Sequence, residues 1–200
     1  MTFWGKNNMN NELELKLQEE FSFMKQNPLD GEQNLYRRFG CDCGDGWYDI
    51  LRNCCMRITQ RYAEAGVPID FFPAQIKEKF GTLRFYYGYE DAQCGIAAFD
   101  FLGSGKSIRI ESGKESDDEQ KENLRRDIAG IVREAEERSK HTCEKCGAEG
   151  VLRTDLSWIQ TLCDTCYADK IKALKEGRNF RADKARQIYE EIQKKKNGKD

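Results

Sequence analysis

The stretch Cys143-Glu144-Lys145-Cys146-Gly147, followed by Cys163-Asp164-Thr165-Cys166, decides how this chain is organised. Sixteen residues separate the two C-x-x-C pairs. Pairs at this separation are typical of a site in which four thiolates hold one Zn²⁺ ion. The ion would have all four tetrahedral positions filled, with none left for water or substrate. The sequence therefore predicts one structural zinc and no catalytic metal.

The residues around these cysteines predict a zinc ribbon over residues 141–167. Val151-Leu152-Arg153 and Trp158–Leu162 have the composition of two short strands between the cysteine pairs. A Zn²⁺ ion with four thiolates has a formal charge of −2, which N–H groups and nearby cations must offset. The candidate cations by proximity in sequence are Lys140, His141, Lys145 and Arg153. A redox dithiol and a rubredoxin-like iron site are the alternatives for the same cysteines.

The composition is that of a folded protein with a modest core. Of the 200 residues, 38% are hydrophobic and 34% are charged, and eleven Phe, eight Tyr and three Trp argue against wholesale disorder. The net charge of −2 gives no global attraction to nucleic acid or membrane, so such binding needs a local patch. The sequence shows no signal peptide and no apolar run near the roughly 20 residues of a membrane span. We expect a cytoplasmic protein without a membrane partner, where paired cysteines favour metal over disulfide.

Residues 71–87 predict the central hairpin of the fold. A two-residue turn at Phe80-Gly81 would place Lys77 opposite Arg84. Because side chains alternate along a strand, the hairpin then has one mainly apolar face. That face is expected to carry Ala74, Ile76, Leu83, Phe85 and Tyr87, with Glu78 as the exception. The competing interpretation is a short helix over residues 73–80, with Pro73 in its first turn.

The opposite face of this hairpin is the candidate binding surface. It carries Gln75, Lys77, Lys79, Thr82, Arg84 and Tyr86. A cationic and partly aromatic face suits a phosphate backbone or an acidic partner. The alternative is an ordinary solvated face of a sheet. The candidate binding residues are Lys77, Lys79, Arg84 and Tyr86.

Helical periodicity predicts three further elements, over residues 11–25, 46–65 and 117–139. Asp45 is the expected N-cap of the second helix, and Gly66 stands where a helix ends. The third helix has a narrow apolar stripe that packs on its own domain or forms a dimer contact. The stripe consists of Leu124, Ile128, Ile131, Ala135 and Arg138.

Residues 96–110 predict a second hairpin, in which Phe99 and Phe101 alternate before the turn and Ile108 and Ile110 alternate after it. Gly105-Lys106-Ser107 resembles the end of a phosphate-binding P-loop. We reject that interpretation because the required first glycine falls at an aspartate and a strand, not a helix, follows.

The tail, residues 168–200, predicts two helices interrupted at Gly177. It holds eleven Lys or Arg and six Asp or Glu, an excess of five positive charges. Lys194-Lys195-Lys196 lies near its end. A basic terminal helix either contacts nucleic acid or is simply a solvated end.

Five cysteines lie outside the two pairs: Cys41, Cys43, Cys54, Cys55 and Cys94. C-x-C and C-C are not zinc-knuckle spacings, and adjacent residues on a helix point about 100° apart. We favour buried or free thiols for these residues over a second metal site.

Catalytic residues are not evident. His141 is the sole histidine, and no Ser/His/Asp arrangement is visible. Asp70, Gln75 and Lys77 are similar to the carboxylate-and-lysine set of some metal-dependent nucleases. Their spacing is too short to place Asp70 on a separate adjoining strand, so the nuclease hypothesis is the weakest one.

Four segments together resemble a group of small bacteriophage and prophage proteins. They are Gly46–Leu51, Gln75–Tyr86, Ser139–Gly147 and Trp158–Cys166. The run Lys77-Glu78-Lys79-Phe80-Gly81 followed by Leu83–Tyr86 is the specific part, and the resemblance covers roughly residues 45–90 and 125–167. It implies a phage-type or bacterial cytosolic protein and brings no activity with it. By analogy with such proteins, counter-defence or host takeover is a reasonable expectation.

The sequence thus predicts an α+β fold: a small antiparallel sheet packed with helices, then a long helix, a four-cysteine zinc ribbon and a helical basic tail. The expected division is an α+β domain at 1–110, an acidic linker and connecting helix at 111–140, the ribbon at 141–167 and the tail at 168–200. The leading functional hypothesis is a non-enzymatic zinc protein that binds a host macromolecule, first of all a protein. Binding of DNA or RNA by the basic hairpin face comes second, and a metal-dependent nuclease third.

Overall fold

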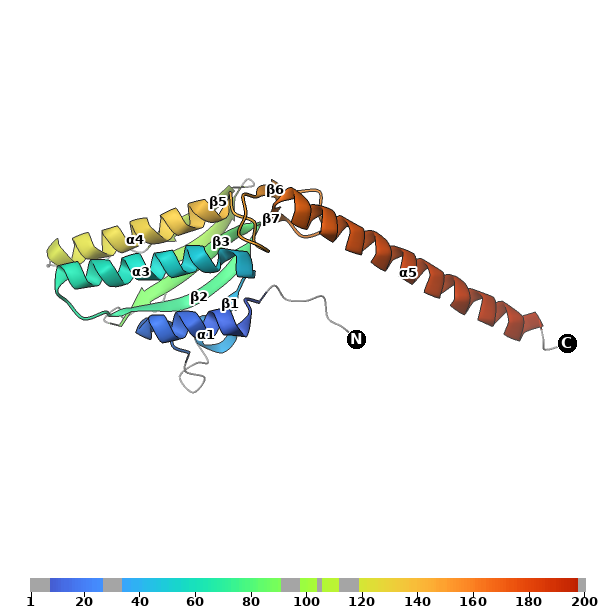
Figure 1. The fold of residues 1–200 in the computed structure, drawn as a ribbon, viewed down its shortest axis with the longest axis horizontal. Coiled ribbons are helices and arrows are strands. Elements are labelled where there is room, and N and C mark those ends of the chain that lie inside the picture. Colours follow the sequence, from blue (N-terminus) through green and yellow to red (C-terminus); the bar gives the residue numbers. More distant parts are fainter. Residues whose placement is uncertain (1–7, 27–33, 91–97, 104–105, 112–118, 198–200) are drawn as a thin grey trace. The chain divides into compact units, whose positions relative to one another are not determined.

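A computed structural model describes residues 8–26, 34–90, 98–103, 106–111 and 119–197. The chain divides into two compact units, Met1–Cys163 and Asp164–Asp200. The first unit combines helices with small sheets, so the α+β expectation is confirmed at that level (Figure 1).

The elements of the first unit follow one another along the chain. The helices are α1 (Asn11–Glu20), α2 (Leu35–Phe39), α3 (Tyr48–Ala65) and α4 (Glu119–Ser139), with short 3-10 turns η1 (Ser22–Met24) and η3 (Asp45–Trp47). The strands are β1 (Cys41–Asp42), β2 (Phe71–Lys79), β3 (Thr82–Tyr89), β4 (Ala98–Gly103), β5 (Lys106–Glu111), β6 (Val151–Arg153) and β7 (Gln160–Leu162).

The central hairpin has the predicted register. β2 and β3 are antiparallel, and Lys77 pairs with Arg84 across them. The helical alternative for residues 73–80 is therefore wrong. A β-bulge between Pro73 and Gln75 shifts the alternation, and Ala74 packs with Tyr86 instead of joining the main core. The expectation for Ala74 was wrong because one extra residue in a strand moves the preceding side chains to the other face.

The main sheet is not wholly antiparallel. Its strand order is β1-β2-β3, and the two-residue strand β1 runs parallel to β2. Asp45 does not cap α3, because its side chain accepts a 2.6 Å hydrogen bond from the backbone N–H of Asn10. The other end of α3 is as expected, since Gly66 has the left-handed φ of 67° that terminates helices.

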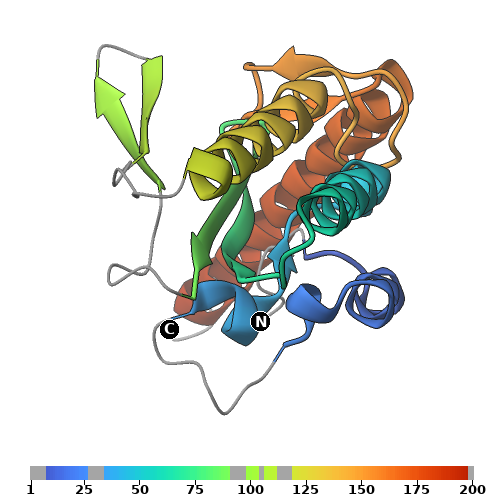
Figure 2. The same cartoon turned by 90° about the vertical axis from the view of Figure 1, so that its left-hand side faces the viewer.

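Helices α3 and α4 lie side by side in both Figure 1 and Figure 2, and they contact each other along their lengths. Packing of α4 on its own domain is thus confirmed. The apolar stripe of α4 is buried except for the exposed Arg138. The largest fully buried side chains of this unit include Trp47, Tyr36, Tyr62, Phe85, Leu51, Ile58, Ile76, Leu83 and Ile128.

Side chains of α4 cover the open edge of β3. The buried carboxylate of Glu136 accepts a 2.9 Å hydrogen bond from the N–H of Phe85. The hydroxyl of Ser139 accepts a 2.8 Å bond from the N–H of Leu83 and donates to the carbonyl of Glu136. Because edge N–H groups otherwise attract further strands, these contacts both close the sheet and fix the end of α4 against it.

Strands β4 and β5 form the second predicted pair, with Phe99 opposite Ile110 and Phe101 opposite Ile108. Lys106 and Ser107 belong to β5, which agrees with the rejection of a P-loop. The predicted turn at residues 104–105 and the acidic linker at 112–118 lie outside the described residues.

The second unit is a single helix, α5 (Asp164–Asn197). The predicted interruption at Gly177 was wrong: glycine costs a helix only about 1 kcal/mol relative to alanine, and 34 residues supply many other hydrogen bonds. In the part of the chain that the structure describes, no helix combines the length and apolar character needed to cross a membrane.

Candidate metal centre

The four predicted ligands lie together. The Sγ atoms of Cys143, Cys146, Cys163 and Cys166 are all within 4.8 Å of one another, so this group could hold a metal ion. Cys143 and Cys166 are buried, Cys163 is partly buried and Cys146 is exposed. Among the described residues, no other group of three or more His, Cys, Asp or Glu side chains gathers in this way.

Tight backbone turns position the first pair of cysteines. The N–H of Gly147 donates to the carbonyl of Cys143 at 2.9 Å, and the N–H of Cys143 donates to the carbonyl of Ala148 at 2.7 Å. Gly147 has a φ of 78°, which glycine adopts without steric cost. We call residues 141–163 the cysteine module; its strands β6 and β7 pair antiparallel, as expected.

A buried carboxylate between the first two cysteines was not foreseen. Glu144 is 1% exposed. Its Oε1 accepts from the N–H of Gly44 at 3.2 Å, and its Oε2 accepts from the side-chain amide of Gln160 at 3.0 Å. Its backbone N–H donates to the carbonyl of Thr161 at 2.9 Å. One residue of the module therefore ties β7 to a loop a hundred positions away.

That loop, residues 43–46, packs directly on the turn of the module. The N–H of Gly46 donates to the carbonyl of Glu144 at 2.8 Å. A Cβ atom on Gly46 would lie 2.2 Å from the carbonyl oxygen of Cys143 and 2.4 Å from the nitrogen of Gly147. Such distances are too short for any side chain, so only glycine permits this approach.

Trp47 extends the same contact into the core. Its indole N–H donates to the carbonyl of Thr142 at 2.9 Å, and its side chain is fully buried. The start of α3 and the start of the cysteine module are therefore fixed to each other by this hydrogen bond.

The tip of the β2–β3 hairpin contacts the other side of the module. The hydroxyl of Thr161 donates to the carbonyl of Gly81 at 2.7 Å. The carboxylate of Glu78 accepts from the N–H of Gly81 at 2.6 Å and from the indole N–H of Trp158 at 2.6 Å. Glu78 interrupts the apolar alternation of β2 because its carboxylate joins the hairpin tip to the module.

The cations expected near the thiols have other contacts. Lys140 pairs with Glu137, and the guanidinium of Arg153 donates to the carbonyl of Leu162 at 3.4 Å. Lys145 and His141 are exposed.

The other cysteines lie in a different environment. Cys41, Cys43, Cys54 and Cys55 are buried free thiols of the main core. Burial raises the pKa of Cys54 to about 12 and raises the pKa of each of the other three well above its ordinary value, because the apolar core disfavours a thiolate. This agrees with the favoured interpretation of buried thiols. Cys94 lies outside the described residues.

The candidate binding residues come together on one face of the hairpin. Lys77 pairs with Arg84 across the strands, and the ammonium of Lys77 lies 5.3 Å from the ring centre of Tyr86. The ammonium of Lys79 lies 5.7 Å from the ring centre of Phe80. Tyr86 is only 9% exposed, so the reachable part of this face is chiefly its cations.

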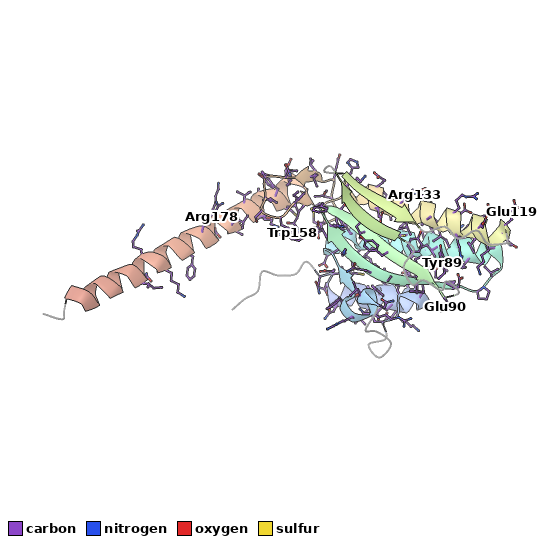
Figure 3. The ribbon with its side chains drawn as sticks, turned by 180° about the vertical axis from the view of Figure 1, so that it is seen from behind. Tyr89, Glu90, Glu119, Arg133, Trp158 and Arg178 are labelled. Carbon is purple, nitrogen blue, oxygen red and sulfur yellow. The ribbon has the colours of Figure 1, made fainter. Side chains whose placement is uncertain are left out.

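The structure does not bring Asp70 and Lys77 together. They are seven positions apart on one extended segment, which corresponds to about 23 Å. The carboxylate of Asp70 instead accepts a hydrogen bond from the hydroxyl of Tyr62 and lies 3.7 Å from the guanidinium of Arg125. Tyr89 and Glu90 lie at this end of the sheet, and Trp158 lies at the opposite end (Figure 3).

No protein-family model matches this chain, and neither does any curated protein or solved structure.

Proposed function

We propose that this protein binds one structural Zn²⁺ and acts by binding a macromolecule of a bacterial host, first of all a protein. A phage-type accessory role in the bacterial cytoplasm, in counter-defence or host takeover, suits such a protein. The observation that carries the proposal is the gathering of four cysteine sulfurs at the point where the module meets both the core and the hairpin tip. A metal ion bound there would hold the module against the core and the hairpin tip, and it would not catalyse a reaction.

The sulfur geometry supports zinc. Four sulfurs bound at about 2.3 Å in a tetrahedron lie about 3.8 Å from one another. The Sγ atoms of Cys146 and Cys163 are 3.7 Å apart, far longer than the roughly 2.05 Å of a disulfide bond. Four thiolates complete the tetrahedral shell of Zn²⁺, so the ion would stabilise the ribbon without binding a substrate. Iron in a rubredoxin-like site has the same ligands, and an element analysis separates the two metals.

Metal content and partner capture test the proposal. Native mass spectrometry of the purified chain should give one zinc per molecule. An affinity pull-down from a bacterial host lysate, with and without nuclease treatment, should capture a protein that nuclease does not release. Two metals per chain would contradict the structural assignment, and capture that depends entirely on nucleic acid would favour the second candidate below.

The second candidate is a nucleic-acid-binding protein that uses Lys77, Lys79, Arg84 and Tyr86. The juxtaposition of Lys77, Arg84 and the ring of Tyr86 on one face supports it. Cations there would neutralise phosphates and release counterions, so affinity for DNA or RNA should fall steeply with salt. The double variant Lys77→Glu, Arg84→Glu should abolish binding of a labelled oligonucleotide at low salt. No detectable binding by the unaltered protein at low salt would remove this candidate.

A further inference from the structure

We propose that three exposed apolar side chains at the junction of hairpin and module dock an acidic, apolar segment of the partner protein. We call this surface the tip patch; it consists of Phe80, Leu152 and Trp158. The inference rests on the proposed protein-binding function and assigns a surface to it. Phe80 comes from the β2–β3 turn, and the other two come from β6 and the loop that follows it.

Direct contacts make these elements one surface. A Cβ atom on Gly81 would lie 2.4 Å from the Cδ1 of Leu152, so the hairpin turn touches this strand of the module. The indole of Trp158 is held by its hydrogen bond to Glu78 of β2. The indole N–H of Trp158 is therefore hydrogen-bonded within the protein, while 62% of the residue is exposed. Figure 3 shows it at the module end of the sheet.

Phe80 is an unusual residue for its position in the β2–β3 turn. Its φ is 55° and that of Gly81 is 75°, so both central residues of this two-residue hairpin turn are left-handed. Turns of this kind strongly prefer Asn-Gly or Asp-Gly, and a bulky residue with positive φ is an outlier. The residue is also 44% exposed, so deep burial does not account for a phenylalanine at this position. An aromatic side chain kept at a strained and exposed position indicates a binding role.

The composition of the patch favours a protein over the other occupants. Leu152 is 44% exposed and contributes an aliphatic side chain beside the two aromatic ones. Aliphatic side chains contribute to the cores of protein interfaces, whereas they offer no stacking face for nucleic-acid bases.

Charge at the edge of the patch specifies the partner further. Lys79 lies beside the ring of Phe80, and Lys77 and Arg84 follow on the same face of the hairpin. Glu78, the carboxylate of the hairpin tip, already accepts hydrogen bonds on both oxygens from Gly81 and Trp158. Three cations against this one carboxylate leave an excess of positive charge beside the patch, which suits a segment in which acidic residues flank apolar ones.

Three short fluorescein-labelled peptides test this directly by fluorescence anisotropy with the full chain loaded with zinc. The first alternates Glu or Asp with Phe, Trp and Leu, the second replaces every acid by Lys, and the third keeps the acids and replaces every apolar residue by Ser. We expect the first to bind at least about tenfold more tightly than either of the others. Equal binding of the first and second peptides, or displacement of the first by unlabelled single-stranded DNA, overturns the proposal.

The variant Phe80→Asn tests the contribution of Phe80 to binding without lowering the stability of the fold. Asparagine suits the left-handed turn, so the melting temperature should stay equal or rise, while affinity for the first peptide should fall by about tenfold or more. Leu152→Gln removes apolar surface and keeps a side chain of similar length, and it should weaken binding severalfold. Met56→Gln is the matched control, because Met56 on α3 is 42% exposed and lies outside the patch, and it should leave binding unchanged.

The same variants distinguish failure of this surface from failure of the proposed function. If the host protein captured in the pull-down is retained equally by Phe80→Asn and Leu152→Gln, the protein-binding function stands and the tip patch is not its surface. If the unaltered chain captures no nuclease-resistant partner, the proposed function itself fails.

Discussion

The core and the cysteine module each contain thiols, and the two sets differ in how their sulfurs are grouped. Cys41, Cys43, Cys54 and Cys55 are all buried in the main core, which holds them as neutral thiols. The four cysteines of the candidate metal centre come within 4.8 Å of one another, and one of them, Cys146, is exposed. A buried thiol in an apolar core acts as a small apolar side chain, whereas four sulfurs gathered at one point can bind a metal.

The two regions are nevertheless coupled. The loop at Gly44–Gly46 belongs to the core side and packs against the turn of the module, with Glu144 hydrogen-bonded across the contact. A change in the stability of the module should therefore also change the stability of the core, because this loop joins the two regions. Substitutions on either side can show how far the two regions behave as one folding unit.

The largest effect is expected from removing a ligand. Cys143→Ser should abolish metal binding and lower the free energy of unfolding of the module by several kcal/mol, since structural zinc contributes about 10–16 kcal/mol in small peptides. Native mass spectrometry and thermal unfolding measure the two quantities. Cys54→Ala is the matched control, with the metal retained and a loss of only about 1 kcal/mol. Loss of the metal from Cys54→Ala would contradict the assignment of Cys54 to the core thiols that bind no metal.

Thiol reactivity is the second expected difference. Because burial holds the pKa of Cys54 at about 12, its thiolate fraction at pH 8 is about a thousandfold below that of a thiol with a pKa of 9. Iodoacetamide followed by peptide mass analysis should leave the core cysteines unmodified in the folded protein. Chelation of the metal should expose Cys146 to alkylation while Cys54 stays protected. Modification of Cys54 at the rate of Cys146 would contradict the assigned environments.

A third prediction addresses the contact between the regions. Gly46→Ala should destabilise the protein by about 3 kcal/mol, because the new methyl group would overlap backbone atoms of Cys143 and Gly147. Denaturant unfolding measures the change. Gly130→Ala is the matched control: nothing lies within 4 Å of its added Cβ in helix α4, and the protein should gain about 1 kcal/mol. Equal effects of the two substitutions would mean that the loop does not pack on the module.

The smallest expected effect concerns the carboxylate of Glu14 beside the core cysteines. Burial raises the pKa of Glu14, although the hydrogen bond it accepts from the N–H of Cys41 opposes the shift. A raised pKa in the folded state means that this group favours folding in acid and loses that contribution as pH rises through the folded pKa. Glu14→Gln keeps an acceptor oxygen and removes the charge. It should stabilise the protein by less than about 1 kcal/mol at pH 7, and the gain should shrink as pH falls through the raised folded pKa towards 4.5.

Chemical denaturation of Glu14→Gln and the unaltered protein at both pH values provides the check. Glu134 on α4 offers a contrasting group, because its pairing with Arg57 lowers its pKa. The stabilisation from that pair is present above the unfolded pKa and is lost as pH falls through the folded pKa. A gain from Glu14→Gln that grows in acid would have the wrong sign and would contradict the buried environment of Glu14.

Short-range patterns in the sequence determined a substantial part of this protein. The C-x-x-C spacing predicted the four residues that gather at the candidate metal centre. The Phe80-Gly81 turn predicted the register of the hairpin, and the glycine at 66 predicted the end of α3. These features depend on bond geometry and on residues a few positions apart, which a single sequence displays directly.

Contacts between distant segments were decided only by the tertiary structure. In the sequence, Glu144 cannot be distinguished from an exposed charged residue. Only the fold brings Gly44 and Gln160 to its carboxylate. Likewise, the sequence shows Glu136 and Ser139 only as polar residues of a helix. The structure places the open edge of β3 against them. Each of these polar side chains is buried only because a partner from elsewhere in the chain satisfies its hydrogen bonds. A buried polar group is stable only when paired, and the pairing partner is fixed by the fold and not by spacing along the sequence.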